Sequence, residues 1–227
     1  MEITKSREQA VVEELKEQVR REKIIAIVRG IPGEKIVKTV EALRAGGIRF
    51  VEVTFAQSSP SCMKDTPGAI ATLCDRFPDL HIGAGTVLTL DQTEAAHKAG
   101  AKYIISPNTD ESIIARTREL GMLSMPGALT PSEIVRAYDA GATFVKIFPA
   151  ADFGAAYIKA VRAPISHIPM LAVGGISDTN MAEYYAAGVC GFGIGGSLVD
   201  RKLIDTGDFI ALSAAAGRYV AAAARLS

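Results

Sequence analysis

The sequence predicts an α/β protein that folds as one closed parallel (β/α)8 barrel, the TIM-barrel architecture, with an extra helix at the N-terminus. Apolar runs of strand length alternate with longer segments of helical periodicity. A helix-ending glycine recurs before strand after strand, as in Ala99-Gly100, Leu120-Gly121 and Ala140-Gly141. The alternation yields eight strands, the number that closes such a barrel. An open doubly wound sheet is the alternative if one strand is miscounted.

The expected elements follow in chain order. A charged segment of about Arg7 to Arg21 has apolar residues at helical spacing and predicts a helix lying on the body. An alanine-rich stretch from about Ala211 to Ala224 predicts the last helix. We therefore expect a single domain with an N-terminal helix (1–22), a barrel (23–205) and a C-terminal helix (206–227). The expected strands are about 24–28, 50–55, 81–85, 103–106, 122–125, 143–148, 168–173 and 190–194.

Composition excludes several classes of protein. Lys+Arg and Asp+Glu both number 25, so no net field would recruit nucleic acid or an anionic membrane. The 3 cysteines are scattered without metal-ligand spacing, which favours reduced thiols over a disulfide framework or a zinc site. The N-terminus is charged and no apolar run is long enough for a membrane span. We expect a soluble cytoplasmic protein without a bound metal.

A lysine interrupts one of the expected apolar strands. Lys146 lies in the middle of Thr143–Pro149, and Glu52 lies in the same way inside Phe50–Phe55. A desolvated lysine lowers its pKa toward that of a neutral amine, which is a nucleophile for carbonyl carbons. The alternative is structural: the lysine stem lies along apolar surface, or the two residues form a buried ion pair.

Further polar and glycine residues follow the strands. In a parallel barrel the C-terminal strand ends form one face, which carries the chemistry. The residues expected there are Arg29, Glu52 with Thr54, Thr86, Ser106-Pro107-Asn108, Pro126-Gly127, Lys146 with Phe148-Pro149, Gly174-Gly175 and Gly195-Gly196-Ser197. The two Gly-Gly pairs predict a phosphate site made of backbone N–H groups, strengthened by a helix N-terminus expected after Ser197. Tight turns are the alternative for these glycines.

Together these residues favour imine chemistry. Forming and breaking an imine moves several protons, and the Glu52 carboxylate could shuttle them. The Thr86 hydroxyl and the Arg29 guanidinium could hold the carboxylate of an α-keto acid.

Six motifs in order resemble the 2-keto-3-deoxy-6-phosphogluconate / 4-hydroxy-2-oxoglutarate aldolase family over about residues 20 to 205. They are Glu52-Val53-Thr54, Gly83-Ala84-Gly85-Thr86-Val87, Ile105-Ser106-Pro107, Val145-Lys146-Ile147-Phe148-Pro149-Ala150, Gly174-Gly175-Ile176 and Gly195-Gly196-Ser197. The resemblance implies a class I aldolase that forms its imine on Lys146, with no metal or cofactor. The implied substrate is a small phosphorylated keto acid, cleaved to pyruvate and glyceraldehyde 3-phosphate, with 4-hydroxy-2-oxoglutarate as a further candidate. A homotrimer is also implied.

The resemblance also implies roles for single residues. Glu52 is the implied general acid/base, and Thr86 is an implied ligand of the pyruvyl carboxylate. Pro107 and Phe148 are expected to keep water from the amine. The implied phosphate cradle is Gly174, Gly175, Gly195, Gly196 and Ser197.

Three positions depart from the family pattern. Ala56 stands where many members have an arginine, so either Arg29 takes over anion binding or the carboxylate is held more loosely. Val173 stands where the gluconate-type enzymes usually have threonine, and Asn108 stands where glycine is common. Val173 and Asn108 look more like the 6-phosphogalactonate branch, and either epimer remains possible as the substrate.

Two other functions fit the same barrel. A phosphosugar epimerase or decarboxylase would need clustered histidines and aspartates, whereas His81, His97 and His167 are scattered and Pro149 occupies the place of one required aspartate. A non-catalytic phosphosugar-binding protein would use the glycines alone.

Four polar residues just before helical stretches have a simpler interpretation. They are predicted helix N-caps: Asp91, Asp110, Ser132 and Asp178.

Overall fold

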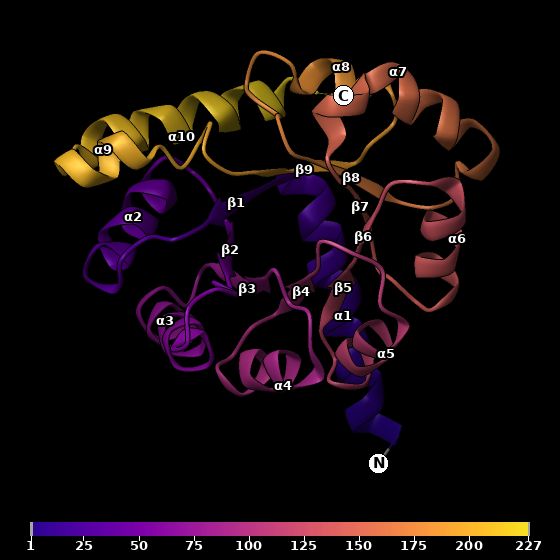
Figure 1. The fold of residues 1–227 in the computed structure, drawn as a ribbon, viewed down its shortest axis with the longest axis horizontal. Coiled ribbons are helices and arrows are strands. Elements are labelled where there is room, and N and C mark those ends of the chain that lie inside the picture. The colour runs from indigo at the N-terminus through magenta and orange to yellow at the C-terminus, as the bar shows by residue number, and fades with distance from the viewer. Residues whose placement is uncertain (1, 227) are drawn as a thin grey trace.

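Parallel strands form a ring surrounded by helices (Figure 1). A computed structural model describes residues 2–226, with side chains from residue 9 onward. The strands are β1 (Ile24–Val28), β2 (Phe50–Thr54), β3 (His81–Gly85), β4 (Tyr103–Ile105), β5 (Leu123–Met125), β6 (Gly127–Ala128), β7 (Val145–Ile147), β8 (Met170–Val173) and β9 (Gly191–Ile194). The helices are α1 (Glu2–Glu22), α2 (Gly33–Ala45), α3 (Cys62–Arg76), α4 (Leu90–Lys98), α5 (Glu111–Glu119), α6 (Pro131–Asp139), α7 (Ala150–Arg162), α8 (Met181–Ala186), α9 (Arg201–Thr206) and α10 (Phe209–Ala224), with a 3₁₀ turn at Ala163–Ile165. The predicted fold class, including the helix before the first strand, is confirmed.

The barrel closes through a strand that is interrupted by a proline. The sheet order runs β5-β4-β3-β2-β1-β9-β8-β7-β6, and its two ends are separated along the chain by Pro126 alone. Proline has no N–H to donate, so the ladder breaks there. The backbone N–H groups of Thr143 and Lys146 still donate to the carbonyls of Ser124 and Pro126 at 2.8 and 2.9 Å. β5 and β6 are therefore the two halves of the fifth predicted strand.

Side chains alternate between two apolar layers along each strand. On β7, Val145 and Ile147 pack in the core between the strands and the helices. Phe144 belongs instead to an apolar cluster inside the barrel. Because successive strand residues point to opposite faces, Lys146 shares the inward face with Phe144. By the same alternation, Glu52 on β2 faces inward.

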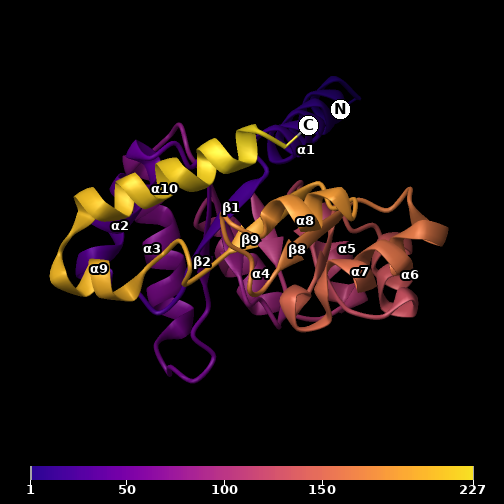
Figure 2. The same ribbon diagram turned by 90° about the horizontal axis from the view of Figure 1, so that it is seen from above.

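The N-terminal end of the barrel interior is filled and covered by α1. Leu15 and Val19 of α1 pack against the inner cluster, which consists of Ile25, Phe50, Tyr103, Ile105, Leu123, Met125, Phe144 and Leu171. The Arg20 guanidinium lies 5.5 Å from the centre of the Phe144 ring. In Figure 2, α1 and α10 lie on the same side of the molecule, and the two helices are in contact. The extra N-terminal helix thus closes the barrel interior at this end.

Several expected element ends and caps were displaced. The strands expected at 143–148 and 168–173 are shorter, at Val145–Ile147 and Met170–Val173. Pro149 and Pro169 cannot donate ladder bonds at those ends.

Among residues 2–226, no helix has both the length and the apolarity needed to cross a membrane. The cysteines are free thiols.

Of the four predicted N-caps, only Asp110 is right, since its carboxylate accepts from the Ser112 and Ile113 N–H groups. Helix α4 is capped by Thr89 instead of Asp91, and α6 is capped by Thr130 instead of Ser132. Helix α8 begins after Asn180, whereas Asp178 lies 3.8 Å from Arg218. In each of these three helices the cap lies two residues from the predicted position, because several candidate cap residues stand close together in the sequence.

Candidate active site

A cavity of about 270 Å³ opens at the C-terminal ends of the strands β1, β7, β8 and β9. Its lining consists of Ile27, Arg29, Lys146, Phe148, Val173, Gly174, Gly175, Ile176, Gly193, Gly195, Gly196 and Ser197. The structure therefore brings together most of the predicted site residues. Glu52, Thr86 and Pro107 lie outside this lining.

Three lining residues were not predicted: Ile27, Ile176 and Gly193. The period of two along a strand was the available signal for two of them. Ile27 stands two residues before Arg29, and Gly193 stands two residues before Gly195, so each pair shares a strand face. Ile176 lies in the loop after β8, where no such periodicity applies.

Lys146 is held inside the barrel on β7. The residue is 5 % exposed, and its Nζ lies 4.6 Å from the centre of the Phe148 ring. Burial lowers the pKa of the Lys146 ammonium group, and the nearby charge of Arg29 lowers it further, while the Glu52 carboxylate opposes both effects. The dominant effect favours the neutral amine, which is the nucleophilic form.

Glu52 lies on β2 and is 1 % exposed. Neither of its carboxylate oxygens has a hydrogen-bonding partner among the described residues. Burial raises the pKa of the Glu52 carboxyl group, and the positive charges of Lys146 and Arg29 only partly oppose that rise. An unpaired buried carboxyl is costly, and the site keeps both oxygens free for a ligand or for proton transfer.

Glycine makes the space that the Glu52 carboxylate occupies. Gly85 on β3 faces the carboxylate, and a Cβ atom there would overlap Glu52 Oε1. The register places Glu52 beside Gly83, on the same strand as Gly85. Any larger residue at Gly85 would push the carboxylate away from its position.

The glycines after β8 and β9 present unpaired backbone N–H groups. Gly174 and Gly175 have positive φ values of 95° and 73°. The N–H groups of Gly196 and Ser197 make no backbone hydrogen bond within the described chain. Such N–H groups can bind an anion.

The predicted helix N-terminus is not at this place. α9 begins only at Arg201, where Asp200 caps it. The Ser197 hydroxyl donates to the Ile176 carbonyl at 2.7 Å, which leaves the backbone N–H groups as the donors of the cradle.

The remaining predicted residues occupy strand ends around the cavity. Arg29 is exposed at the end of β1 and lines the cavity. Thr86 follows β3 with a positive φ of 57°. Pro107 is half-buried after β4, and its carbonyl lies against Gly127 of β6. Ala56, one of the three positions that depart from the family pattern, is exposed.

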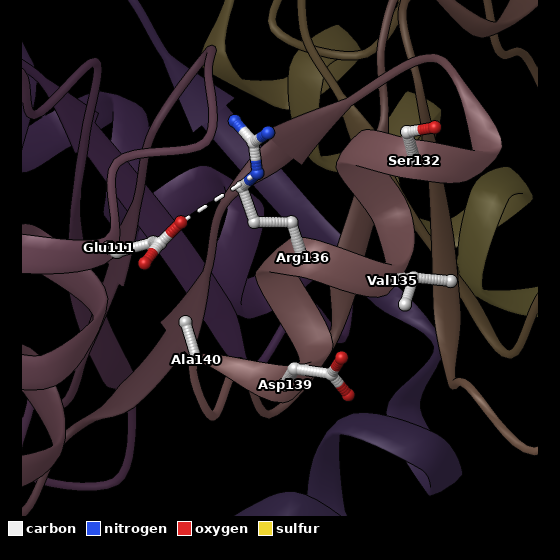
Figure 3. Close-up of a pocket in the computed structure, with 6 residues that line it drawn as sticks. All are labelled: Glu111, Ser132, Val135, Arg136, Asp139 and Ala140. Atoms are coloured by element: carbon white, nitrogen blue, oxygen red, sulfur yellow. Dashed lines mark ion pairs between the residues drawn. The ribbon is translucent and has the colours of Figure 1, made fainter.

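A second, shallow hollow of about 420 Å³ lies on the outside of the barrel (Figure 3). Its lining comes from the start of α5 and from α6: Glu111, Ser132, Val135, Arg136, Asp139 and Ala140. The Arg136 side chain points toward Glu111, and their Nε and Oε1 atoms are 3.7 Å apart. Both side chains are largely exposed, so water screens the pair. No buried titratable group lines this hollow, in contrast to the cavity around Lys146.

Comparison with known proteins is consistent with this site. The family model for KDPG and KHG aldolase matches residues 15–215. A probable 2-dehydro-3-deoxy-6-phosphogalactonate aldolase of Rhizobium meliloti (strain 1021) is 37% identical over 77% of this chain and 81% of its own. A 2-dehydro-3-deoxy-phosphogluconate aldolase of Treponema pallidum (strain Nichols) is 34% identical over 87% of this chain and 92% of its own.

Solved structures of similar proteins share the fold of this chain. A native KDPGal structure has a TM-score of 0.79 at 34% identity and covers 88% of this chain and 93% of its own. KDPG aldolase from Legionella pneumophila, with pyruvate captured as a covalent carbinolamine intermediate, has a TM-score of 0.78 at 29% identity. That match covers 86% of this chain and 93% of the Legionella chain.

Proposed function

The chain belongs to the KDPG and KHG aldolase family and is a lyase, and from this premise we propose that Lys146 and Glu52 perform its class I aldolase reaction. The substrate is a 2-keto-3-deoxy-6-phospho sugar acid, and the products are pyruvate and glyceraldehyde 3-phosphate. One observation carries this assignment: a buried amine, whose pKa is lowered by burial, shares the inward face of the barrel with a buried carboxyl that accepts no hydrogen bond from the described residues.

The first half of the reaction forms an imine. The Lys146 amine adds to the C2 carbonyl of the substrate and gives a carbinolamine. Loss of water from the carbinolamine needs an acid, and burial keeps the Glu52 carboxyl protonated to a higher pH than usual. The product of this half is an iminium cation on Lys146.

The second half breaks the C3–C4 bond. The iminium carries a fixed positive charge where the neutral amine had none, so it lowers the proton affinity of Glu52. Glu52 can then take the C4 hydroxyl proton, directly or through a water molecule. The electron pair of the C3–C4 bond passes into the iminium as glyceraldehyde 3-phosphate leaves. Protonation of the resulting enamine and hydrolysis of the imine release pyruvate and restore the amine.

Two anion sites would hold the ends of the substrate. The exposed Arg29 guanidinium and the Thr86 hydroxyl are the candidates for the carboxylate. The unpaired N–H groups of Gly196 and Ser197, beside the Gly174-Gly175 turn, are the candidates for the phosphate. Phe148 and Pro107 would limit the access of water to the amine, which keeps its pKa low.

We assign the galactonate epimer as the preferred substrate. Val173 lines the cavity beside Ile27 and Gly193, and its side chain can make no hydrogen bond to a substrate hydroxyl. A site without that bond lacks the contact by which a threonine would favour the gluconate epimer, and two relatives that are 37% identical to this chain are named as phosphogalactonate aldolases. In assays of both phosphorylated epimers, kcat/KM should favour the galactonate substrate by about tenfold or more. Val173→Thr should shift the preference toward the gluconate epimer, and equal values for both epimers in the wild type would refute the assignment.

Three further properties rest on the family resemblance. They are cleavage of 4-hydroxy-2-oxoglutarate to pyruvate and glyoxylate, a homotrimeric assembly, and a cytoplasmic location. Light scattering of the purified protein tests the assembly, and an assay with the unphosphorylated substrate tests the second activity.

Borohydride trapping tests the proposed nucleophile. Incubation with pyruvate and sodium borohydride should reduce the imine to a stable secondary amine, and peptide mass analysis should place the added mass on Lys146. An adduct at another lysine, or no adduct at all, would refute the assignment.

A further inference from the structure

The turn after β3 holds Thr86 in an unusual backbone conformation. Its φ is 57°, and among the described residues only one other non-glycine residue, Lys23, has a positive φ. Positive φ is strongly disfavoured for a β-branched residue. Glycine would adopt this conformation without strain, so a threonine here needs an interaction that holds it.

Two glutamine side chains supply that interaction. The Gln57 amide nitrogen donates to the Thr86 carbonyl at 2.5 Å. The Gln92 amide nitrogen donates to Gln57 Oε1 at 3.0 Å, and Gln92 Oε1 accepts from the Leu88 N–H at 2.7 Å. These three hydrogen bonds link the Thr86 carbonyl, through the two glutamine side chains, to the N–H of Leu88, two residues further along the chain. We call the side chains of Gln57 and Gln92 the amide relay.

The polarity of the amide relay is determined by its members. The Leu88 N–H can only donate, so Gln92 must turn its oxygen toward it and its NH₂ group toward Gln57. Gln57 must then turn its oxygen toward Gln92 and its NH₂ group toward Thr86. Gln92 is 4 % exposed, so each of these bonds is costly to lose at that residue.

The relay acts next to the proposed chemistry. Gly85, the residue before Thr86, lies against the Glu52 carboxylate. A continued strand would alternate and turn Thr86 to the face opposite Gly85, toward the helices. None of the hydrogen bonds found among the described side chains uses the Thr86 hydroxyl, which leaves it available for a ligand.

We propose that Gln57 and Gln92 are positioning residues that hold the Thr86 backbone so that its hydroxyl can bind the carboxylate of the keto acid. This inference rests on the function proposed above. The relay sets the affinity for the pyruvyl group and leaves the chemical steps on Lys146 and Glu52 unchanged.

The test uses Gln57→Ala, because Gln57 is exposed and its loss should leave the fold intact. The concentration of pyruvate that gives half-maximal borohydride trapping, and the KM of the phosphorylated substrate, should both rise about fivefold to tenfold, the size expected for the loss of one typical hydrogen bond. The kcat value should change by less than about twofold, since the chemical groups are untouched. Gln57→Glu should have a larger effect, because a carboxylate cannot donate to the Thr86 carbonyl.

Ser58→Ala is the matched control, since Ser58 is exposed on the same loop and belongs to neither the relay nor the site. Ser58→Ala should leave the half-saturating pyruvate concentration and the KM of the phosphorylated substrate unchanged. A double-mutant cycle gives the decisive readout: in a Thr86→Ala background, Gln57→Ala should cause no further rise in the half-saturating pyruvate concentration.

Equal half-saturation for wild type and Gln57→Ala would overturn the inference while the wild-type adduct on Lys146 still supported the proposed function. Additive effects of the two substitutions would also overturn it, because they would show that Gln57 does not act through Thr86. Absence of any wild-type adduct would refute both proposals together.

Discussion

The two ends of the barrel interior are built from the same strands but hold opposite kinds of side chain. At the N-terminal end, β2 contributes Phe50 and β7 is preceded by Phe144, and α1 covers this apolar cluster. Two residues further along, the same inward faces carry Glu52 and Lys146. One end is a packed core, whereas the other buries two titratable groups beside an open cavity.

Glycines on the inward faces explain how the two ends differ. A Cβ on Gly83 would overlap the Tyr103 ring, so the space there is filled by an aromatic side chain of the packed end. Two residues on, the space at Gly85 is filled by the Glu52 carboxylate. No described atom comes within 4 Å of a Cβ built on Gly195 or Gly196. The same residue type therefore serves packing at one end and ligand access at the other.

Replacing the nucleophile should have the largest effect. Lys146→Met keeps the length and apolar stem of the side chain and makes the open end resemble the packed one. We expect no detectable turnover and no borohydride adduct, together with a cooperative thermal melt, because only the amine is lost. Turnover comparable to that of the wild type would show that the difference between the two ends is not catalytic.

Replacing the carboxyl should have the next largest effect. Glu52→Gln keeps the shape of the side chain but removes proton transfer, so kcat for cleavage should fall by about 10²–10⁴. Stopped-flow assay of pyruvate release measures this value. Glu41→Gln makes the same change at an exposed carboxyl on α2, away from the site, and as the matched control it should stay close to the wild type.

Truncation at the packed end should affect stability and spare activity. Leu15→Ala removes an α1 side chain that packs on the inner cluster, and we expect a loss of about 2–4 kcal/mol in the free energy of unfolding. Denaturant titration measures the loss, and kcat at a temperature below the melt should be unchanged. Val11→Ala on the same helix, where the side chain is 64% exposed, should change stability by less than about 0.5 kcal/mol. A large fall in kcat for Leu15→Ala would mean that the two ends are coupled.

The smallest expected effect is a pH-dependent loss of stability caused by the buried Glu52 carboxyl at the open end. The pKa of Glu52 is raised in the folded state, so the folded protein binds the proton more tightly than the unfolded chain does. The contribution of Glu52 to stability therefore falls as pH rises from its ordinary pKa of about 4.5 through the raised value. Relative to the wild type, Glu52→Gln should gain stability across that window by about 1 kcal/mol or more. Denaturant midpoints at a series of pH values measure the gain, and a difference that is constant with pH would contradict the assigned burial effect.

Local patterns in the sequence predicted most of the fold and the central residues of the site. The helix-ending glycines divided the chain into βα units, and the period of two placed Lys146 opposite Val145 and Ile147, which pack outward. An ionisable residue within a continuous apolar run is visible without any structure, because its desolvation is costly wherever the strand lies. Helix caps were less predictable, since Thr130 and Ser132 both fit the same helix start and only Thr130 bonds to the Glu133 N–H.

By itself, the sequence determined the alternation of strands and helices, the inward amine and carboxyl, and the glycines of the cavity, because each depends on residues that are near in the chain. Only the tertiary structure decided the covering of the barrel by α1, the space that Gly85 leaves for Glu52, and the relay from Gln92 through Gln57 to Thr86. These features join segments tens of residues apart. Their distances and hydrogen-bond directions follow from strand register and barrel closure, which no local spacing specifies.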